Sequence, residues 1–248
     1  MDLRERSEQH GLRHPWEVVR ARFFGNRIVK ATGNQPVSIL DLGSGDCWFA
    51  EQLLPRLPSG STITCCDINF TELDLSTPTA MGITKMRVLP EGRFDIVVLL
   101  DVIEHVENDM DFLQTNVQPK LVEGGMVLVS VPAHPSLYSE HDEFLGHYRR
   151  YTRRQLLAAT NTMFTHRQNG YLFVSLALVR FLQRLLPKKR LDEQQGIGSW
   201  TSGKSLTRTV TILLSIDALV SVALRRLRIQ LPGLTVWVSS TGKVIKSH

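Results

Sequence analysis

Apolar and polar positions alternate along the first two thirds of the chain in two different periods. Short, mostly apolar runs predict strands at residues 37–42, 61–66, 96–100 and 126–131. Segments with helical spacing lie between some of them, at residues 48–57 and 108–122. Strands that alternate with helices predict a parallel sheet that is connected by right-handed crossovers.

The flanks of this unit have their own patterns. Residues 1–36 mix charged and aromatic positions at helical spacing and predict a helical cap over the main domain. A helix is also expected at about residues 152–163, with Thr152 as its N-cap, and a final strand at residues 234–239.

Residues 171–186 and 209–224 are both apolar, and each contains one charge, Arg180 or Asp217. Each run has about 16 residues, fewer than the roughly 20 of a transmembrane helix. Two interpretations stay open: a pair of core or lid helices, or an interfacial pair that lies on a membrane surface. The basic groups beside them fit either interpretation, because cations also stabilise helix ends; these groups are Lys188, Lys189, Arg190, Arg225, Arg226 and Arg228.

These patterns divide the 248 residues into four parts. We expect a helical cap at residues 1–36, a main α/β domain at 37–170, an apolar and basic helical lid at 171–230, and the last strand of the main domain at 231–248.

Charge is distributed unevenly along the chain, whose net charge is +5. Residues 171–248 hold 12 basic and three acidic residues, whereas residues 1–170 are net acidic. A basic region next to apolar helices favours an anionic surface as partner. Three cysteines cannot all pair, and the N-terminus lacks the apolar core of a secretory signal, so we expect a reduced, cytoplasmic protein, with a peripheral membrane position at the inner face as an open alternative.

A glycine turn follows the first predicted strand, where backbone N–H groups can meet a ligand. A dinucleotide fingerprint would place its third glycine at position 48, but that residue is Trp48. A nicotinamide enzyme is therefore disfavoured. Asp67 ends the second strand, 24 positions after Gly43, near the spacing at which a carboxylate accepts hydrogen bonds from ribose hydroxyls.

The sequence resembles the class I S-adenosylmethionine-dependent methyltransferases. The resemblance rests on Asp67 and on three stretches: Ile39-Leu-Asp-Leu-Gly-Ser-Gly-Asp46, Phe94-Asp-Ile-Val-Val-Leu-Leu-Asp-Val-Ile-Glu-His-Val106 and Gly124-Gly-Met-Val-Leu-Val-Ser-Val-Pro132. It implies a doubly wound, Rossmann-like α/β fold with a seven-stranded sheet whose last strand is antiparallel, plus an inserted helical lid. It also implies S-adenosyl-L-methionine as cofactor.

The same resemblance implies the cofactor-binding residues. Asp41, Gly43 and Gly45 face the methionine portion, Asp67 the ribose, and Asp101 the region beside the sulfonium. Leu89 is included because it lies in the segment that contacts adenine in many members, although an acidic residue that is common there is absent.

Residues 131–151 resemble the loop after the corresponding strand in bacterial methyltransferases of glycan and lipid biosynthesis. This likeness predicts methylation of a hydroxyl on a lipid-linked or glycan-type acceptor. A small-molecule acceptor, an RNA methyltransferase and a catalytically idle cofactor-binding scaffold are the alternatives, and the acidic main domain argues against nucleic acid as partner.

A hydroxyl acceptor requires a base, and the loop supplies candidates. We expect His141, Asp142 and His147 to be catalytic, with His141 first, because imidazole suits proton removal near neutral pH. The expected substrate-binding residues are His134, Tyr148, Arg149 and Arg150. Each could instead stabilise the loop through hydrogen bonds.

Asp101, Glu104 and His105 stand at helical spacing and could hold a divalent metal together with His134, as a similar pattern does in small-RNA 2′-O-methyltransferases. A glutamate in the first turn of a helix and a capping histidine explain these residues more simply, so we expect no metal.

Overall fold

The computed structural model describes residues 12–185, 200 and 202–243. Seven strands form its sheet: β1 (Ser38–Leu42), β2 (Thr62–Cys66), β3 (Ile83–Met86), β4 (Phe94–Leu100), β5 (Leu121–Pro132), β6 (Phe164–Leu172) and β7 (Thr235–Gly242). The α-helices are α1 (Pro15–Thr32), α2 (Trp48–Leu53), α3 (Glu72–Ser76), α4 (Asp109–Phe112), α5 (Glu140–Leu145), α6 (Arg153–Asn161), α7 (Val174–Leu185) and α8 (Lys204–Arg226). Short helical turns complete the set: η2 (Leu54–Arg56), η3 (Ile103–His105), η4 (Leu113–Val117), η5 (Gln118–Lys120) and η6 (Pro135–Leu137).

The sheet has the order β3-β2-β1-β4-β5-β7-β6. β1 is parallel to β2 and β4, β4 is parallel to β5, and β7 runs antiparallel to both β5 and β6. The seven-stranded, doubly wound α/β sheet with its last strand antiparallel is therefore confirmed.

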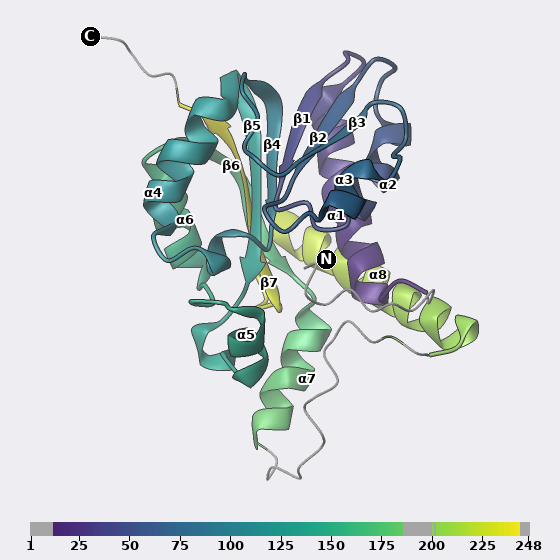
Figure 1. The fold of residues 1–248 in the computed structure, drawn as a ribbon. Helices are drawn as coiled ribbons and strands as arrows, with labels where there is room; N and C mark the ends of the chain where they lie inside the picture. The colour runs from purple at the N-terminus through teal and green to yellow at the C-terminus, as the bar shows by residue number, and fades with distance from the viewer. Residues whose placement is uncertain (1–11, 186–199, 201, 244–248) are drawn as a thin grey trace.

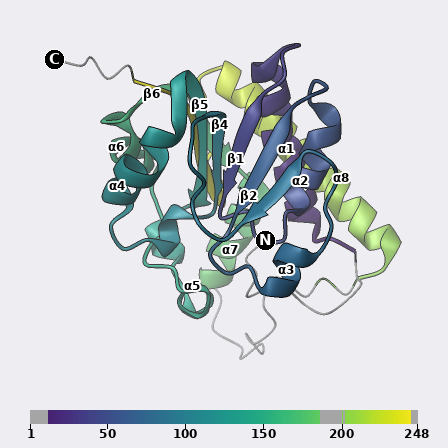
Figure 2. The ribbon, with the colours of Figure 1, turned by 45° about the horizontal axis from the view of Figure 1, so that its top comes forward.

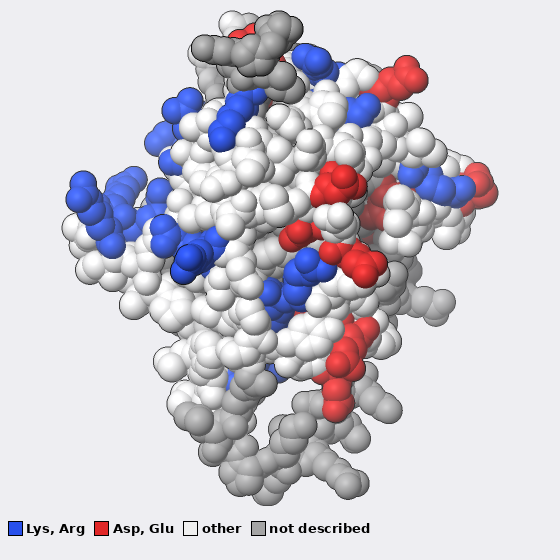
Figure 3. Space-filling view, turned by 90° about the vertical axis from the view of Figure 1, so that its left-hand side faces the viewer, with Lys and Arg blue, Asp and Glu red and all other residues white. Residues whose placement is uncertain are grey.

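Helices cover both faces of the sheet. α4 and α6 lie on one face, and α1, α2 and α8 lie on the other (Figure 1). Each face has its own apolar core: Phe24 and Trp237 belong to the core under α1, and Val129 and Leu156 belong to the core under α6. On the outer surface of the α4 and α6 side, a group of basic side chains lies at one edge, while acidic side chains lie from the middle to the other edge with further basic side chains among them (Figure 3).

The carboxyl ends of the parallel strands are the edge of the sheet where α5 and α7 lie (Figures 1 and 2). Loops from the two halves of the sheet meet at this edge beside the switch in strand order between β1 and β4, the usual position of a ligand in open α/β sheets.

The three cysteines, Cys47, Cys65 and Cys66, are buried and unpaired, as their spacing suggests. Thr152 is the N-cap of α6, and its hydroxyl accepts a hydrogen bond from the Gln155 N–H at 3.2 Å. The cap predicted for this helix is therefore confirmed.

Several predicted boundaries were wrong. The helix expected at residues 108–122 is broken into α4, η4 and η5, and β5 already begins at Leu121. Residues 164–172 form β6, so the helix expected from residue 171 begins at Val174 instead. Asp101 does not open a helix: it has a φ of 60°, and η3 follows it as a short 3₁₀ turn. The basic group at residues 188–190 lies outside the described residues.

Candidate active site

The glycine turn at the end of β1 has a left-handed backbone at three positions, Gly43 (φ 70°), Gly45 (φ 57°) and Cys47 (φ 63°). Gly43 is the position where a side chain fits least, because a Cβ there would lie 2.6 Å from Cγ2 of Val102. The N–H groups of Gly43 and Ser44 donate to the Cys66 carbonyl at 2.7 and 3.3 Å, so the turn is held against the end of β2.

Asp67 lies opposite this turn, at the end of β2. Its Oδ2 accepts a hydrogen bond from the Gly45 N–H at 2.8 Å, and its Oδ1 accepts one from the Asn69 N–H at 2.9 Å. These two bonds fix the orientation of the carboxylate, which still has lone pairs for hydroxyl donors on the cavity that it lines.

Asp41 is buried beneath the turn, and its Oδ2 has no hydrogen-bond partner within the described part of the chain. Burial raises the pKa of this carboxyl to about 7, and the neighbouring carboxylates of Asp67 and Asp46 act in the same direction. A cation that binds nearby favours the ionised form of Asp41, so the residue suits a positively charged ligand.

The start of α1 closes the turn from the other side. Arg20 forms an ion pair with Asp101 and lies 4.3 Å from the centroid of the Trp16 ring. Arg13 pairs with Asp46. These contacts hold the N-terminal part of α1 over the turn, so His14, Trp16 and Arg20 line the same cavity as Gly43 and Asp67.

One cavity of about 680 Å³ connects these groups. This volume lies within the range of small-molecule sites. It extends from the glycine turn past Asp101 to α7, which contributes Leu176, Val179, Arg180 and Gln183. Its far wall comes from the loop between β5 and α6, through His141, His147 and Arg150.

Asp142 organises that loop. This fully buried carboxylate accepts hydrogen bonds from Nδ1 of His147 and Nε of Arg150, both at 2.8 Å, and from the Ser139 N–H at 2.9 Å. Burial alone raises the pKa of Asp142, but the bonds from His147 and Arg150 outweigh this effect and hold it below its ordinary value. Asp142 therefore stays ionised and positions His147 and Arg150 toward the cavity.

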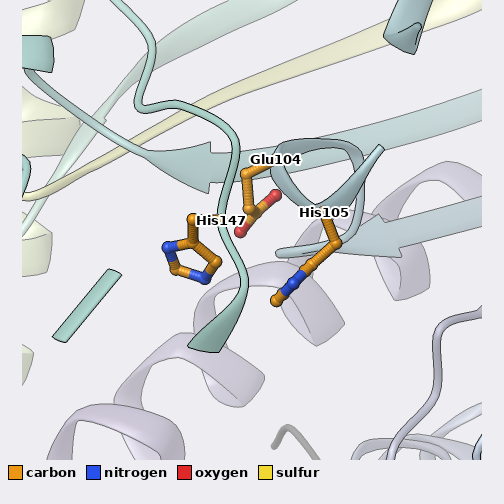
Figure 4. Close-up of side chains that lie close together, drawn as sticks. All are labelled: Glu104, His105 and His147. Atoms are coloured by element: carbon orange, nitrogen blue, oxygen red, sulfur yellow. The ribbon is translucent and has the colours of Figure 1, made fainter. Parts of the chain in front are cut away.

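Glu104, His105 and His147 form a cluster in which the two histidines line the cavity and Glu104 is buried behind them (Figure 4). The imidazole rings of His105 and His147 meet edge to face, with centroids 4.6 Å apart. Glu104 is fully buried beside them, and burial raises its pKa to about 8.

The expected site residues divide into two groups. Gly43, Asp67, Asp101, His141, His147 and Arg150 line the cavity. The others lie beside it: Gly45 orients Asp67, Asp41 and Asp142 are buried behind the lining, and Leu89 packs against the core on the α6 side.

Three expected substrate-binding residues also lie outside the cavity lining. The His134 ring stacks on Tyr171 and bonds the Gly233 carbonyl at 3.0 Å. The Arg149 guanidinium donates to the Glu107 carbonyl at 2.6 Å, and the Tyr148 side chain points outward with 55% of its surface exposed.

Sequence reasoning missed the lining residues from α1 and α7. For α1 a signal was present, because Trp16 and Arg20 are separated by four positions and share one face of the predicted helix. For α7 the apolar run gave no sign of which side faces a ligand.

Comparisons with known proteins agree with this geometry. A family model described as a methyltransferase domain matches residues 9–211. A search of curated proteins found no match.

Several solved structures share the fold. The N-methyltransferase NodS from Bradyrhizobium japonicum, in complex with S-adenosyl-L-homocysteine, is 13% identical, with 92% of this chain and 88% of that chain covered and a TM-score of 0.54. A putative sarcosine dimethylglycine methyltransferase from Galdieria sulphuraria is 12% identical, with 91% and 85% covered and a TM-score of 0.54. The plantazolicin methyltransferase BpumL, in complex with a monoazolic desmethylPZN analog and SAH, is 14% identical, with 92% and 85% covered and a TM-score of 0.53.

The family match spans most of the chain, and the glycine turn, the oriented Asp67 and the cavity provide a site that fits the cofactor. The chain belongs to the methyltransferase domain family and is a class I S-adenosylmethionine-dependent methyltransferase.

Proposed function

We propose that the protein methylates a hydroxyl group of an amphiphilic acceptor of the lipid-linked or glycan type. The observation that carries the proposal is the continuity between the cofactor end of the cavity and α7, a helix with apolar side chains both inside and outside. Leu176 and Val179 line the cavity, while Leu178 and Leu182 are more than half exposed on the outer surface. An acceptor with an apolar tail can therefore lie along α7 with its polar end near the cofactor.

α8 presents a longer apolar surface. Leu214 and Ala218 face the protein, whereas an exposed stripe runs along the opposite side at Ile212, Leu213, Ile216, Leu219 and Val220. The expectation of a helix of about 16 residues at 209–224 was wrong, because α8 has 23 residues. By length and composition it could cross a membrane, and 11% of its most apolar window is buried. Its packing against α1 and β6 along one side suits a helix that lies flat on a surface.

Basic residues flank the α8 stripe at both ends. Lys204 and Arg208 are exposed at its start, and Arg226 and Arg228 at its end. An apolar stripe between cations fits the interface of an anionic membrane, where each nearby cation contributes about 1 kcal/mol. The proposed position is therefore peripheral, with α7 and α8 against the lipid headgroups.

S-adenosylmethionine supplies the electrophilic methyl group when it is bound. Of the candidates for the base, His141 lines the cavity, and burial lowers its pKa, so it is neutral and able to accept a proton near pH 7. Arg150 and Arg180 line the same region and suit a phosphate or carboxylate on the acceptor. Asp142 keeps His147 and Arg150 in place.

The membrane part is tested by sedimentation with vesicles of phosphatidylglycerol, using phosphatidylcholine vesicles for comparison. The protein is expected to sediment with the anionic vesicles, and the double variant I216S/L219S is expected to stay in solution. Leu73→Ser, which removes a leucine from α3 that is more exposed than either Ile216 or Leu219, is the control and retains binding.

The acceptor part is tested by methyl transfer from labelled S-adenosylmethionine to detergent-solubilised lipid-linked glycans and to the same glycans without lipid. Faster transfer to the lipid-linked form supports the proposal. Efficient methylation of soluble small molecules alone, with no transfer to any amphiphile, contradicts it.

A further inference from the structure

Glu104 is a buried carboxyl group whose two oxygens lack a hydrogen-bond partner within the described part of the chain. None of its surface is exposed, and neither Oε1 nor Oε2 has a hydrogen-bond partner of acceptable geometry among the residues that the structure describes. Burial of a carboxylate without compensation is costly, and native structures pair such groups with donors, cations or metal ions. Glu104 lies behind the cavity lining, next to the lining residues His105 and His147, where a bound cation would compensate its charge.

Two imidazoles surround this carboxyl group. One ligand atom from each of Glu104, His105 and His147 lies within 4.8 Å of the others (Figure 4). Donor atoms about 2.1 Å from one ion lie roughly 3.4 Å apart in tetrahedral geometry, so small side-chain rotations suffice to bring these three together.

His147 is already oriented as metal-ligating histidines usually are. Its Nδ1 donates to the ionised Asp142 at 2.8 Å, which leaves the lone pair on Nε2. In Figure 4, Nε2 lies on the side of the ring that faces Glu104 and His105. A carboxylate that fixes the tautomer of a ligating histidine is a common outer-shell arrangement of metal sites.

The net charge around Glu104, His105 and His147 is compatible with a bound cation. Arg20 is paired with Asp101, and Arg150 with Asp142, so these four charges cancel. A metal ion that binds displaces the proton of Glu104, and the ionised carboxylate then adds one negative charge that no described ion pair neutralises. A divalent cation bound to Glu104 gives the pair a net charge of +1. This positive charge stabilises a hydroxyl oxygen that develops negative charge beside it.

We propose that Glu104, His105 and His147 bind one divalent first-row transition-metal ion, with its open coordination positions toward the cavity. Two nitrogen ligands and one carboxylate favour ions such as Zn²⁺, Mn²⁺ or Co²⁺ over Mg²⁺ and Ca²⁺, which prefer oxygen ligands alone. The set differs from the one considered on sequence grounds, because His134 lies against Tyr171 and His147 takes its place. The simpler explanation, a glutamate in the first turn of an α-helix, does not apply to the 3₁₀ turn η3.

The ion has a role that rests on the proposed function. An acceptor hydroxyl on an open position is polarised by the metal, and its proton passes to His141. The oxygen then forms a bond to the methyl carbon while the carbon–sulfur bond breaks. The products are a methyl ether, S-adenosylhomocysteine and protonated His141.

The site is tested without methyl donor or acceptor, so that the result is independent of the proposed function. Metal-free full-length protein is titrated with Co²⁺ by visible absorption and with Zn²⁺ by calorimetry. We expect one equivalent to bind, with a ligand-field spectrum typical of nitrogen and oxygen ligands in four- or five-coordinate geometry, and Zn²⁺ to raise the unfolding temperature.

Two variants assign the ligands. Glu104→Gln retains the shape of the side chain and His147→Asn removes one nitrogen ligand; each is expected to weaken Co²⁺ binding by at least about tenfold and to change the spectrum. His166→Asn, on β6, is the matched control and leaves both unchanged. If one equivalent does not bind, or if Glu104→Gln folds and binds Co²⁺ as tightly as the wild type, the metal site is wrong. If the ion binds but methyl transfer does not depend on it, the metal site stands and its role in the reaction fails.

Discussion

The buried carboxyl of Asp41 leads to a quantitative prediction about stability and pH. In the folded protein burial raises its pKa from 3.8 to about 7. Unfolded Asp41 releases its proton near its ordinary pKa, so between these values the unfolded state binds fewer protons than the folded state. The contribution of Asp41 to stability is therefore complete below about pH 4 and is lost as the pH rises through 7.

The perturbation is Asp41→Asn in the cofactor-free protein. The amide has its own packing cost, but that cost is the same at every pH and cancels when two pH values are compared. From the two pKa values, the wild type loses about 3 kcal/mol relative to the variant between pH 5 and pH 8.

The assay is urea unfolding, followed by tryptophan fluorescence, at pH 5, 6, 7 and 8. Asp111→Asn, at an exposed carboxyl on α4, is the control and is expected to follow the wild type. If the stability of Asp41→Asn and of the wild type changes in parallel with pH, the pKa of Asp41 is not raised, and a counter-charge keeps this carboxylate ionised without cofactor.

Three further substitutions test other parts of the site. Gly43→Ala is expected to destabilise the protein by about 1 to 3 kcal/mol more than Gly92→Ala. Both glycines have a positive φ, but only Gly43 has a close neighbour, Val102. Equal losses of stability in urea unfolding would contradict this. Asp142→Asn is expected to lower the free energy of unfolding by about 3 kcal/mol, because it weakens the hydrogen bonds from His147 and Arg150. A loss below about 1 kcal/mol would argue against Asp142 as the residue that organises the loop. Asp217, on α8, accepts hydrogen bonds from the N–H groups of Val174 and Ser175 at the start of α7, and Asp217→Ala removes this link. Amide hydrogen exchange in α7 is then expected to accelerate, while exchange in α6 stays the same. Unchanged exchange in α7 would contradict the link.

The fold was predictable where a short local pattern determines it. The apolar run of β1, the glycine turn and the carboxylate that ends β2 are all visible within a few residues, and together they specify the cofactor end of the cavity. β6 was missed because its middle, from Thr165 to Asn169, is polar, and its last apolar residues run directly into those of α7. Such a strand is determined by its pairing with β7, about 70 residues later in the chain.

The candidate site was predictable only in part, for a related reason. His141, His147 and Arg150 stand in a loop rich in polar residues, and their chemistry could be read from their types. The central role of Asp142 could not, because it depends on which donors the folded loop brings to one carboxylate. The isolation of Glu104 depends equally on the distant loop that covers it, where the Tyr148 N–H bonds its backbone carbonyl at 2.8 Å.

We infer that the glycine turn and Asp67 bind the cofactor. The most direct test is calorimetric titration of the purified protein with S-adenosylhomocysteine, repeated on Asp67→Ala and on Glu123→Ala, which removes an exposed carboxylate at the far end of β5. We expect saturable binding to the wild type and to Glu123→Ala, and a loss of at least about tenfold in affinity for Asp67→Ala, because a fixed acceptor for the ribose hydroxyls is removed. Absence of binding to the folded wild type, or equal binding to all three proteins, would contradict the account.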